Sequence, residues 1–217
     1  MIDYKKIVDN EEIKTYIKTA DESLIALGYT EHSFAHVMKV SNDAGYILKS
    51  LGYDEYYINL AKIAGYMHDI GNLTNRNDHS QSGAIMAFQI LKGLNVDPKE
   101  ISLIVSAIGN HDEGTGVAVN PVAAALIIAD KSDVRRSRVR NSNVEKFDIH
   151  DRVNYSVIES KLSISEGEIL LTLKIDTEIS SIIEYFEIFM NRMIMCKNAA
   201  LKLNQKFRLK INGQLIM

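Results

Sequence analysis

Histidine and aspartate occur side by side at two places in this sequence, each time after an apolar stretch. His68–Asp69 follows the segment INLAKIAGYM, and His111–Asp112 follows ISLIVSAIGN. Neighbouring residues do not share a helix face, but where a helix ends the chain turns, and both side chains can then approach one ion. Imidazole nitrogen and carboxylate oxygen suit Fe, Mn, Co or Zn and do not select copper(I). The His68–Asp69 pair therefore indicates a metal centre.

By itself, His68–Asp69 has a simpler explanation, because a histidine at a helix C-terminus interacts favourably with the helix dipole. Other positions weaken that explanation. His36 lies on the long helix predicted before the pair, His79 directly precedes another helix, and Asp130 lies inside the most apolar helix. A buried carboxylate needs a cation or several hydrogen-bond donors. Together with His111, these residues predict that five helices each bring one or two ligands to a common point.

The elements that would position these ligands are helices. Apolar residues at helical spacing, with capping residues and glycines between the segments, continue to about residue 133. The expected helices are 11–27, 33–51, 54–68, 80–91, 97–110 and 121–133. The last of these contains the segment VAAALIIAD, which predicts a central buried helix.

The pattern changes after Lys131, where a basic stretch leads into alternating apolar and polar residues. Segments 155–165 and 168–175 predict a β-hairpin around Glu166–Gly167. Segment 180–207 predicts one long amphipathic helix, and 209–216 a final strand that Asn212–Gly213 disturbs. The sequence thus predicts a mainly α protein. Residues 1–152 form the helical metal-binding domain, and residues 153–217 form a small α+β appendage packed on it.

The ordered set H…HD…D resembles the HD-domain metal-dependent phosphohydrolase superfamily over residues 20–140. His36, then HDIGN from His68, then ADKSD around Asp130 carry this resemblance. The resemblance implies an HD-domain helical bundle in which His36, His68, Asp69 and Asp130 hold one metal. His79 and His111 occupy the places of two additional histidines in members that bind two metals, where Asp69 would bridge the ions. The ten-residue spacing from Asp69 to His79 is short for such members.

The chemistry implied is hydrolysis of a phosphate ester or anhydride, with a nucleotide among the candidate substrates. One or two divalent transition metals (Fe, Mn, Co, Ni or Zn) would lower the pKa of a bound water and neutralise charge that develops on the phosphate. Asp69 and Lys131 would be the catalytic residues. The chain has one cysteine, Cys196, and neither a GxSxG motif nor a Walker phosphate loop.

Several polar residues near the expected ligands are candidates for substrate binding. Arg76 could clamp a phosphate, or be a solvated loop arginine, and Asn72 could orient a ligand, or be a turn residue. Lys131 directly follows Asp130 and could reach oxygens of the substrate. Arg135 and Arg138 could bind an anion, although such a basic run is usually a solvated helix end.

The sequence also gives an expected role for three further residues. Glu113 is expected to be a loop carboxylate, with a role in holding a histidine tautomer as the alternative. His32 is expected at the surface. His150 lies outside the family motif and is expected to be structural, with a substrate contact as the alternative.

Two other functions stay open at this point. Some members of the superfamily use a two-iron site to oxygenate polyols or phosphonates, and the six-residue ligand set allows this. A regulatory module without activity is the second alternative, and the intact ligand set counts against it.

The composition limits the classes of binding partner that we expect for this protein. The net charge of −3 gives no support for stable nucleic-acid binding, and no stretch is long and apolar enough to cross a membrane. The charged N-terminal segment lacks a signal-peptide core, and the lone cysteine fits a reducing compartment, so a cytoplasmic protein is expected. The expected partner is a small phosphorylated molecule or nucleotide. The segment EYFEIFMNRMIM could pack in the core or form a homodimer surface.

Overall fold

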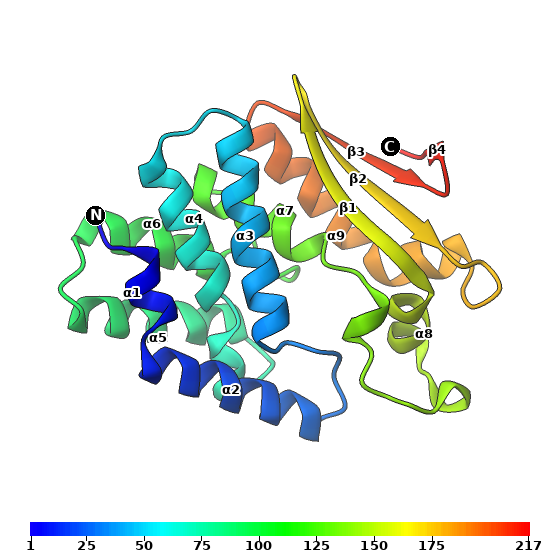
Figure 1. The fold of residues 1–217 in the computed structure, drawn as a ribbon, viewed down its shortest axis with the longest axis horizontal. Coiled ribbons are helices and arrows are strands. Elements are labelled where there is room, and N and C mark those ends of the chain that lie inside the picture. Colours follow the sequence, from blue (N-terminus) through cyan, green and yellow to red (C-terminus); the bar gives the residue numbers. More distant parts are fainter.

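Seven helices form the N-terminal part of the protein, and the last five of them carry or adjoin the predicted metal ligands. The computed structural model describes all 217 residues, and Figure 1 shows these helices grouped at the N-terminal side of the molecule. Their bounds are α1 Tyr4–Val8, α2 Glu11–Ala26, α3 Phe34–Ser50, α4 Glu55–Met67, α5 His79–Gly93, α6 Pro98–Gly109 and α7 Pro121–Lys131. A short 3-10 helix, Ile70–Leu73, joins α4 to the loop before α5.

The starts of these helices follow from side-chain caps in the sequence. Ser33 and Asp54 accept hydrogen bonds from backbone N–H groups in the first turns of α3 and α4. Asp97 and Asn120 do the same for α6 and α7, where a proline occupies the first turn. Such caps satisfy N–H groups that have no partner inside the helix. The caps fix the residue at which each helix begins. They thereby help to set the position of the ligand that the helix carries.

Helix α7 is the centre of the helical part. All of its residues from Val122 to Lys131 are buried, as expected for a helix that is apolar all round. It packs against α3, α4, α6 and α9. Because α7 is enclosed in this way, its C-terminal residues Asp130 and Lys131 are held inside the protein.

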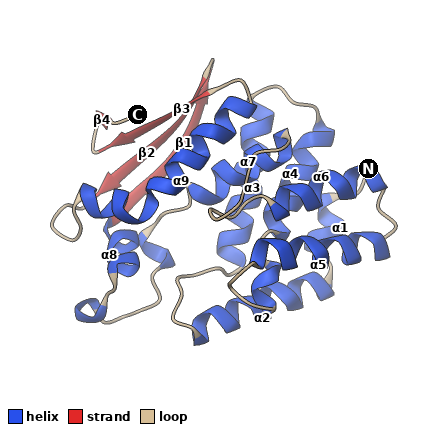
Figure 2. Cartoon of the chain, turned by 180° about the vertical axis from the view of Figure 1, so that it is seen from behind, coloured by secondary structure: helices blue, strands red, loops and turns tan.

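The C-terminal part is a small mixed sheet with one long helix. Its elements are α8 Ile149–Ser156, β1 Val157–Ser165, β2 Glu168–Ile175, α9 Ile182–Lys202, β3 Lys206–Ile211 and β4 Gln214–Leu215. The strands lie in the order β1-β2-β3-β4, and β2 pairs with β3 in parallel while the other pairs are antiparallel. Figure 2 shows α9 running along the sheet, between it and the other helices.

The predicted fold class, mainly α with a small C-terminal α+β part, is confirmed. None of the helices has both the length and the apolar character needed to cross a membrane. The predicted division between residues 152 and 153 falls inside α8 and stays a prediction. The sequence did not predict helices α1 and α8.

Two predicted boundaries near the C-terminus are wrong. The long helix ends at Lys202, not at residue 207, because Asn204 adopts a left-handed conformation that stops a helix. Residues 209–216 are not one strand. Asn212 and Gly213 both have positive φ and make the turn between β3 and β4, which is the geometry that Asn-Gly favours in hairpins.

The turn after His68–Asp69 depends on a glycine. A Cβ atom at Gly71 would lie 1.9 Å from the carbonyl oxygen of His79 and 2.5 Å from the backbone nitrogen of Gly83. The 3-10 helix therefore packs directly on the first turn of α5. This close approach brings His68–Asp69 next to His79.

We predict that Gly71→Ala lowers the free energy of unfolding by about 3 kcal/mol, since the added methyl would force backbone apart. Gly93→Ala is the matched control, because a Cβ there meets nothing within 4 Å and alanine favours helix. Urea denaturation would measure both. A Gly71→Ala midpoint equal to that of Gly93→Ala would contradict the packing argument.

Candidate metal centre

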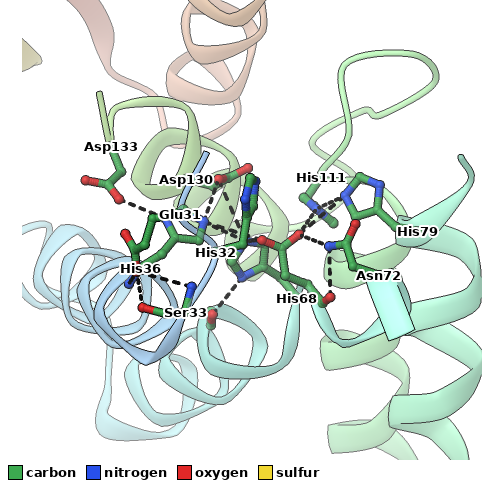
Figure 3. Close-up of polar contacts among 12 residues, drawn as sticks. Glu31, His32, Ser33, His36, His68, Asn72, His79, His111, Asp130 and Asp133 are labelled. Carbon is green, nitrogen blue, oxygen red and sulfur yellow. Dashed lines mark hydrogen bonds and ion pairs between the residues drawn. The ribbon is translucent and has the colours of Figure 1, made fainter. Parts of the chain in front are cut away.

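Four imidazole rings from four helices meet in the interior. His36 lies in the first turn of α3, His68 ends α4, His79 begins α5 and His111 follows α6. All four are buried. They form two pairs, with 3.3 Å between the Nε2 atoms of His36 and His68 and 3.1 Å between those of His79 and His111. Figure 3 shows the rings converging from separate elements.

The other ring nitrogen of each histidine is hydrogen-bonded away from the centre. In His68, His79 and His111, Nδ1 donates to the backbone carbonyl oxygen three residues earlier, at 2.8, 3.1 and 2.6 Å. Carbonyl oxygens only accept, so the hydrogen of the neutral ring is on Nδ1. Each Nε2 therefore directs an unprotonated lone pair into the centre, as a metal ligand does.

His36 is held by a carboxylate instead. Its Nδ1 donates to Asp133 Oδ2 at 2.8 Å. Asp133 is completely buried and also accepts a hydrogen bond from Arg135 Nε at 2.9 Å. A carboxylate behind a histidine fixes the tautomer and the ring orientation and makes the inward nitrogen more basic.

The carboxylate of Asp69 lies between the two histidine pairs. Its Oδ2 is 3.2 Å from His68 Nε2 and 3.5 Å from His36 Nε2, and its Oδ1 is 3.4 Å from His79 Nε2 and 3.9 Å from His111 Nε2. Each oxygen thus faces one pair of nitrogens.

Asp130 adds a second carboxylate on the His36–His68 side. Its Oδ1 lies 3.4 Å from His36 Nε2 and 3.7 Å from His68 Nε2. The structure therefore brings together all six residues predicted as ligands. Asp112 is more distant, with its Oδ1 4.0 Å from His79 Nε2.

Four of the six predicted ligands have the protonation state that metal binding requires. Burial alone would raise the pKa of Asp69 and Asp130, but the neighbouring His68 ring and the Lys131 ammonium group, respectively, hold these pKa values well below the usual range. Burial lowers the pKa of His79 and His111, so both rings are neutral. Ligands must be deprotonated carboxylates and neutral imidazoles.

His36 shows the need for a cation most directly. Burial opposes its protonation, yet hydrogen bonds to the carboxylates of Asp130 and Asp133 raise its pKa to about 10. A histidine that draws a proton so strongly lies in a field of uncompensated negative charge.

The donor set fits a transition metal. The unprotonated Nε2 atoms of His79 and His111 face each other at 3.1 Å and cannot hydrogen-bond to one another, so a cation is the partner that satisfies them. Two triplets of donor atoms lie within 4.8 Å of one another, one from His36, His68 and Asp130 and one from His68, Asp69 and His111. Nitrogen and oxygen donors without sulfur suit Fe, Mn, Co, Ni or Zn.

Lys131 continues the charged network away from the centre. Its Nζ is 2.8 Å from Asp130 Oδ2 and 3.3 Å from Glu113 Oε2. Glu113 Oε1 in turn lies 2.5 Å from Arg192 Nε on α9. Burial lowers the pKa of Lys131, but the two carboxylates outweigh burial and raise it, so the lysine stays charged.

Glu113 is therefore more than the loop carboxylate that the sequence predicted. Lys131 and Arg192 overcome the effect of burial and lower its pKa to about 2. Arg192 was missed in the sequence. The sequence shows Arg192 only as a single cationic residue within a largely apolar helix. Nothing in the sequence pairs it with Glu113, which lies 79 positions earlier.

The predicted substrate-binding residues fall into two groups. Asn72 Nδ2 donates to Asp69 Oδ1 at 3.1 Å, and Arg76 Nη1 lies 3.3 Å from Asn72 Oδ1. Arg135 contacts Glu31 and Asp133, and buried Arg138 donates to the backbone oxygens of the same two residues. Those arginine contacts are structural ones, so a substrate contact for Arg135 or Arg138 stays a prediction.

His32 is not the surface residue that was expected. It is half-buried, and its ring centroid lies 5.5 Å from that of His36. Its Nδ1 bonds to the carbonyl oxygen of Thr30 at 2.7 Å, and burial holds its pKa well below the usual value. His32 is thus a neutral ring beside the centre, and it borders a cavity that also reaches Arg76, His150 and Arg192.

Several known proteins are similar to a large part of this chain. The model of the HD domain family matches residues 33–153. An uncharacterised protein of Methanocaldococcus jannaschii, MJ1020, is 28% identical over 189 residues, covering 76% of this chain and 71% of the relative. Ribonuclease Y of Campylobacter jejuni is 31% identical over 119 residues, covering 55% of this chain and 21% of the relative.

A solved structure adds a partial likeness. It is described as a predicted HD superfamily hydrolase from an uncultured Thermotogales bacterium, with 24% identity, a TM-score of 0.45, and coverage of 57% of this chain and 67% of that one. The family model alone covers more than half of the chain and includes the residues that form the centre. The chain therefore belongs to the HD domain family, and its buried histidines and aspartates are able to hold a metal ion.

Proposed function

We propose that this protein is a metal-dependent phosphohydrolase that uses two divalent transition metal ions to hydrolyse a phosphate ester or anhydride, with a nucleotide as a candidate substrate. One observation carries the proposal. Two pairs of inward-facing imidazole nitrogens lie on either side of Asp69, and each oxygen of this carboxylate faces one pair. A site of this form matches the binuclear sites in which two metals clamp a phosphate.

The comparisons support the reaction class and leave the substrate open. Ribonuclease Y by its name acts on RNA, whose backbone consists of phosphate esters. This chain spans about a fifth of the length of ribonuclease Y, so that substrate does not transfer to it. Ribonuclease Y is similar to this chain over its HD domain. Hydrolysis of a phosphate ester, stated without a specific substrate, is the activity that the nitrogen and oxygen ligands of this domain support.

The ligands divide between the two ions according to the distances. His36, His68 and Asp130 would hold one ion and His79 and His111 the other, and Asp69 would serve both. The ten-residue spacing from Asp69 to His79 is sufficient here, because Gly71 lets the intervening turn pack directly on α5.

In the reaction a water oxygen forms a new bond to phosphorus while the bond from phosphorus to the leaving oxygen breaks, and a proton of the water passes to the leaving oxygen. When bound, divalent cations lower the pKa of a water and neutralise charge on the phosphate oxygens. Lys131 Nζ lies beside Asp130 and stays protonated. Its raised pKa makes it a weak acid, so its role would be to stabilise negative charge and not to donate a proton.

Arg76 is placed to bind the phosphate. Its Nη1 lies 3.5 Å from His79 Nε2, and the only polar side-chain contacts of the guanidinium are this one and the amide of Asn72. Unlike Arg135 and Arg192, it pairs with no carboxylate. A free guanidinium next to the cluster is suited to bidentate binding of phosphate oxygens.

Asp133 orients a ligand without touching the ions. The carboxylate behind His36 keeps the hydrogen on Nδ1 and leaves Nε2 free for an ion. Without the negative charge of Asp133, the hydrogen of His36 would no longer prefer Nδ1. Comparable changes in other metal sites weaken metal affinity by about 10–100-fold.

We predict that Asp69→Ala abolishes metal retention and lowers hydrolysis of p-nitrophenyl phosphate with Mn²⁺ or Co²⁺ by more than about 100-fold, since it removes a ligand of both ions. Elemental analysis and phosphate release measure the two effects. Asp78→Asn is the control, because Asp78 is exposed in the same loop and asparagine tolerates its left-handed conformation. Full metal content in Asp69→Ala would refute the ligand assignment. Oxygen uptake without phosphate release by the wild-type protein would favour the oxygenase.

We predict that Asp133→Asn lowers metal affinity by about 10–100-fold while the six ligands stay in place. Competition with a fluorescent chelator measures this affinity directly. Asp54→Asn is the matched substitution, because Asp54 caps α4 far from the centre and asparagine caps equally well. Equal affinities for the two variants would show that Asp133 does not tune His36.

A further inference from the structure

A cavity of about 420 Å³ lies beside the metal centre, and residues of five separate segments line it. Tyr29 and His32 border it from the connection between α2 and α3, and Arg76 from the loop before α5. Residues of α8 and α9 line it as well, together with Arg138, whose guanidinium donates to the backbone oxygens of Glu31 and Asp133. The volume is within the range of cavities that bind single small ligands.

The cavity reaches the centre through two of its lining residues. His32 lies edge-on to His36, with ring centroids 5.5 Å apart, and also borders a small void shared with Asp69 and Asn72. Arg76 contacts His79 at 3.5 Å. None of the six predicted ligands lines the cavity itself, so a phosphate bound at Arg76 would lie next to His79, with the rest of the molecule against α8 and α9.

The end near the centre is suited to an anion. Arg76 is partly buried and has no carboxylate within 4 Å, and its guanidinium lies 5.7 Å from the ring centroid of Tyr29. His32 adds a neutral ring whose Nδ1 is bonded to a carbonyl oxygen. A guanidinium without a counterion in such a place favours a phosphate group.

The far end has a different chemistry. Asp148 and Asp151 bring two carboxylates to the wall, and the amide of Asn154 is held by a hydrogen bond to the carbonyl oxygen of His150 at 2.9 Å. Carboxylates accept hydrogen bonds from hydroxyl groups and repel a second anion. Arg192 is already paired with Glu113, and its guanidinium carbon lies 4.5 Å from the ring centroid of Phe189.

We infer that this cavity binds the substrate as a single small phosphate ester with an uncharged, hydroxyl-rich body, the phosphate lying at Arg76 and the body against Asp151 and His150. This rests on the proposed phosphohydrolase activity. Arg138 and Arg192 are already engaged by other groups of the protein, which leaves Arg76 as the one lining guanidinium without a carboxylate or backbone carbonyl partner. A bounded cavity with a single free cation is unlike the extended basic groove that holds a polynucleotide strand. The substrate class is thus a sugar phosphate or a mononucleotide, and not RNA.

Binding of a ligand that cannot react tests the inference apart from catalysis. The probe is the phosphonate analogue of ribose 5-phosphate, with CH₂ in place of the ester oxygen, titrated by calorimetry into the Mn²⁺-loaded protein beside inorganic phosphate. Arg76→Gln should weaken both ligands about 10-fold or more. Asp151→Asn and His150→Ala should weaken the phosphonate about 10-fold and leave inorganic phosphate within 2-fold, because they touch only the body.

Matched controls remove one charge elsewhere. Lys92→Gln takes an exposed cation from α5 and Glu145→Gln an exposed carboxylate from the segment before α8, and neither residue lines the cavity. Both should bind the two ligands as the wild type does. Thermal melting of each variant confirms that it is folded, and His150→Ala serves as the second body variant because the His150 side chain is exposed and makes no hydrogen bond.

The outcomes separate the two proposals. If wild-type protein hydrolyses p-nitrophenyl phosphate but Asp151→Asn and His150→Ala bind the phosphonate normally, the cavity assignment is overturned and the phosphohydrolase stands. If a single-stranded RNA hexamer binds more tightly than the phosphonate and the variants do not affect it, the substrate is a polynucleotide and the inference fails. If the binding pattern appears while no phosphate ester is hydrolysed, the cavity stands and the proposed reaction falls.

Discussion

The ionised carboxylate of Asp69, buried between two pairs of imidazole nitrogens, is the interaction on which this structure depends. Its Oδ1 faces the nitrogens of His79 and His111, which cannot bond to one another, and the oxygen of Asp130 adds more negative charge on the His36 side. Left without a cation, such a cluster costs several kcal/mol of desolvation and repulsion. The raised pKa of His36, about 10, is the response of the protein alone to this charge.

That constraint explains why the ligands come from the ends of helices. The carbonyl oxygens in the last turn of a helix have no partner within the helix, so they are free to accept from side chains. His68 and His111 donate from Nδ1 to such an oxygen three residues earlier. The ring is then fixed without help from other residues. His36 lies in the first turn of α3, where the carbonyl oxygen of Ser33 already accepts from the N–H of Val37, so its ring is held by the distant carboxylate of Asp133. The difference follows from backbone hydrogen bonding and not from the histidines themselves.

The sequence was informative about the centre because its determinants are local. Caps such as Ser33 and Asp54, the proline of α7 and the apolar run before Asp130 each act within a few residues, and together they placed the six candidate ligands at helix ends or in a buried helix. The contacts that were missed are long-range. The Glu113–Arg192 pair and the cavity beside His32 depend on how α9 crosses the helical part, and no local pattern encodes that crossing.

The appended sheet bears on the site through the same helix. Parallel strands β2 and β3 need a crossover connection, and α9 is that connection. Its buried side packs on α7, which carries Asp130 and Lys131, while Arg192 bonds to Glu113 and borders the cavity. Helix α9 therefore cannot shift without disturbing either the sheet or the central helix. Because α9 is held from both sides, Arg192 keeps a fixed position. The sheet is distant from the metal ligands, but by holding α9 in place it sets the shape of the cavity beside them.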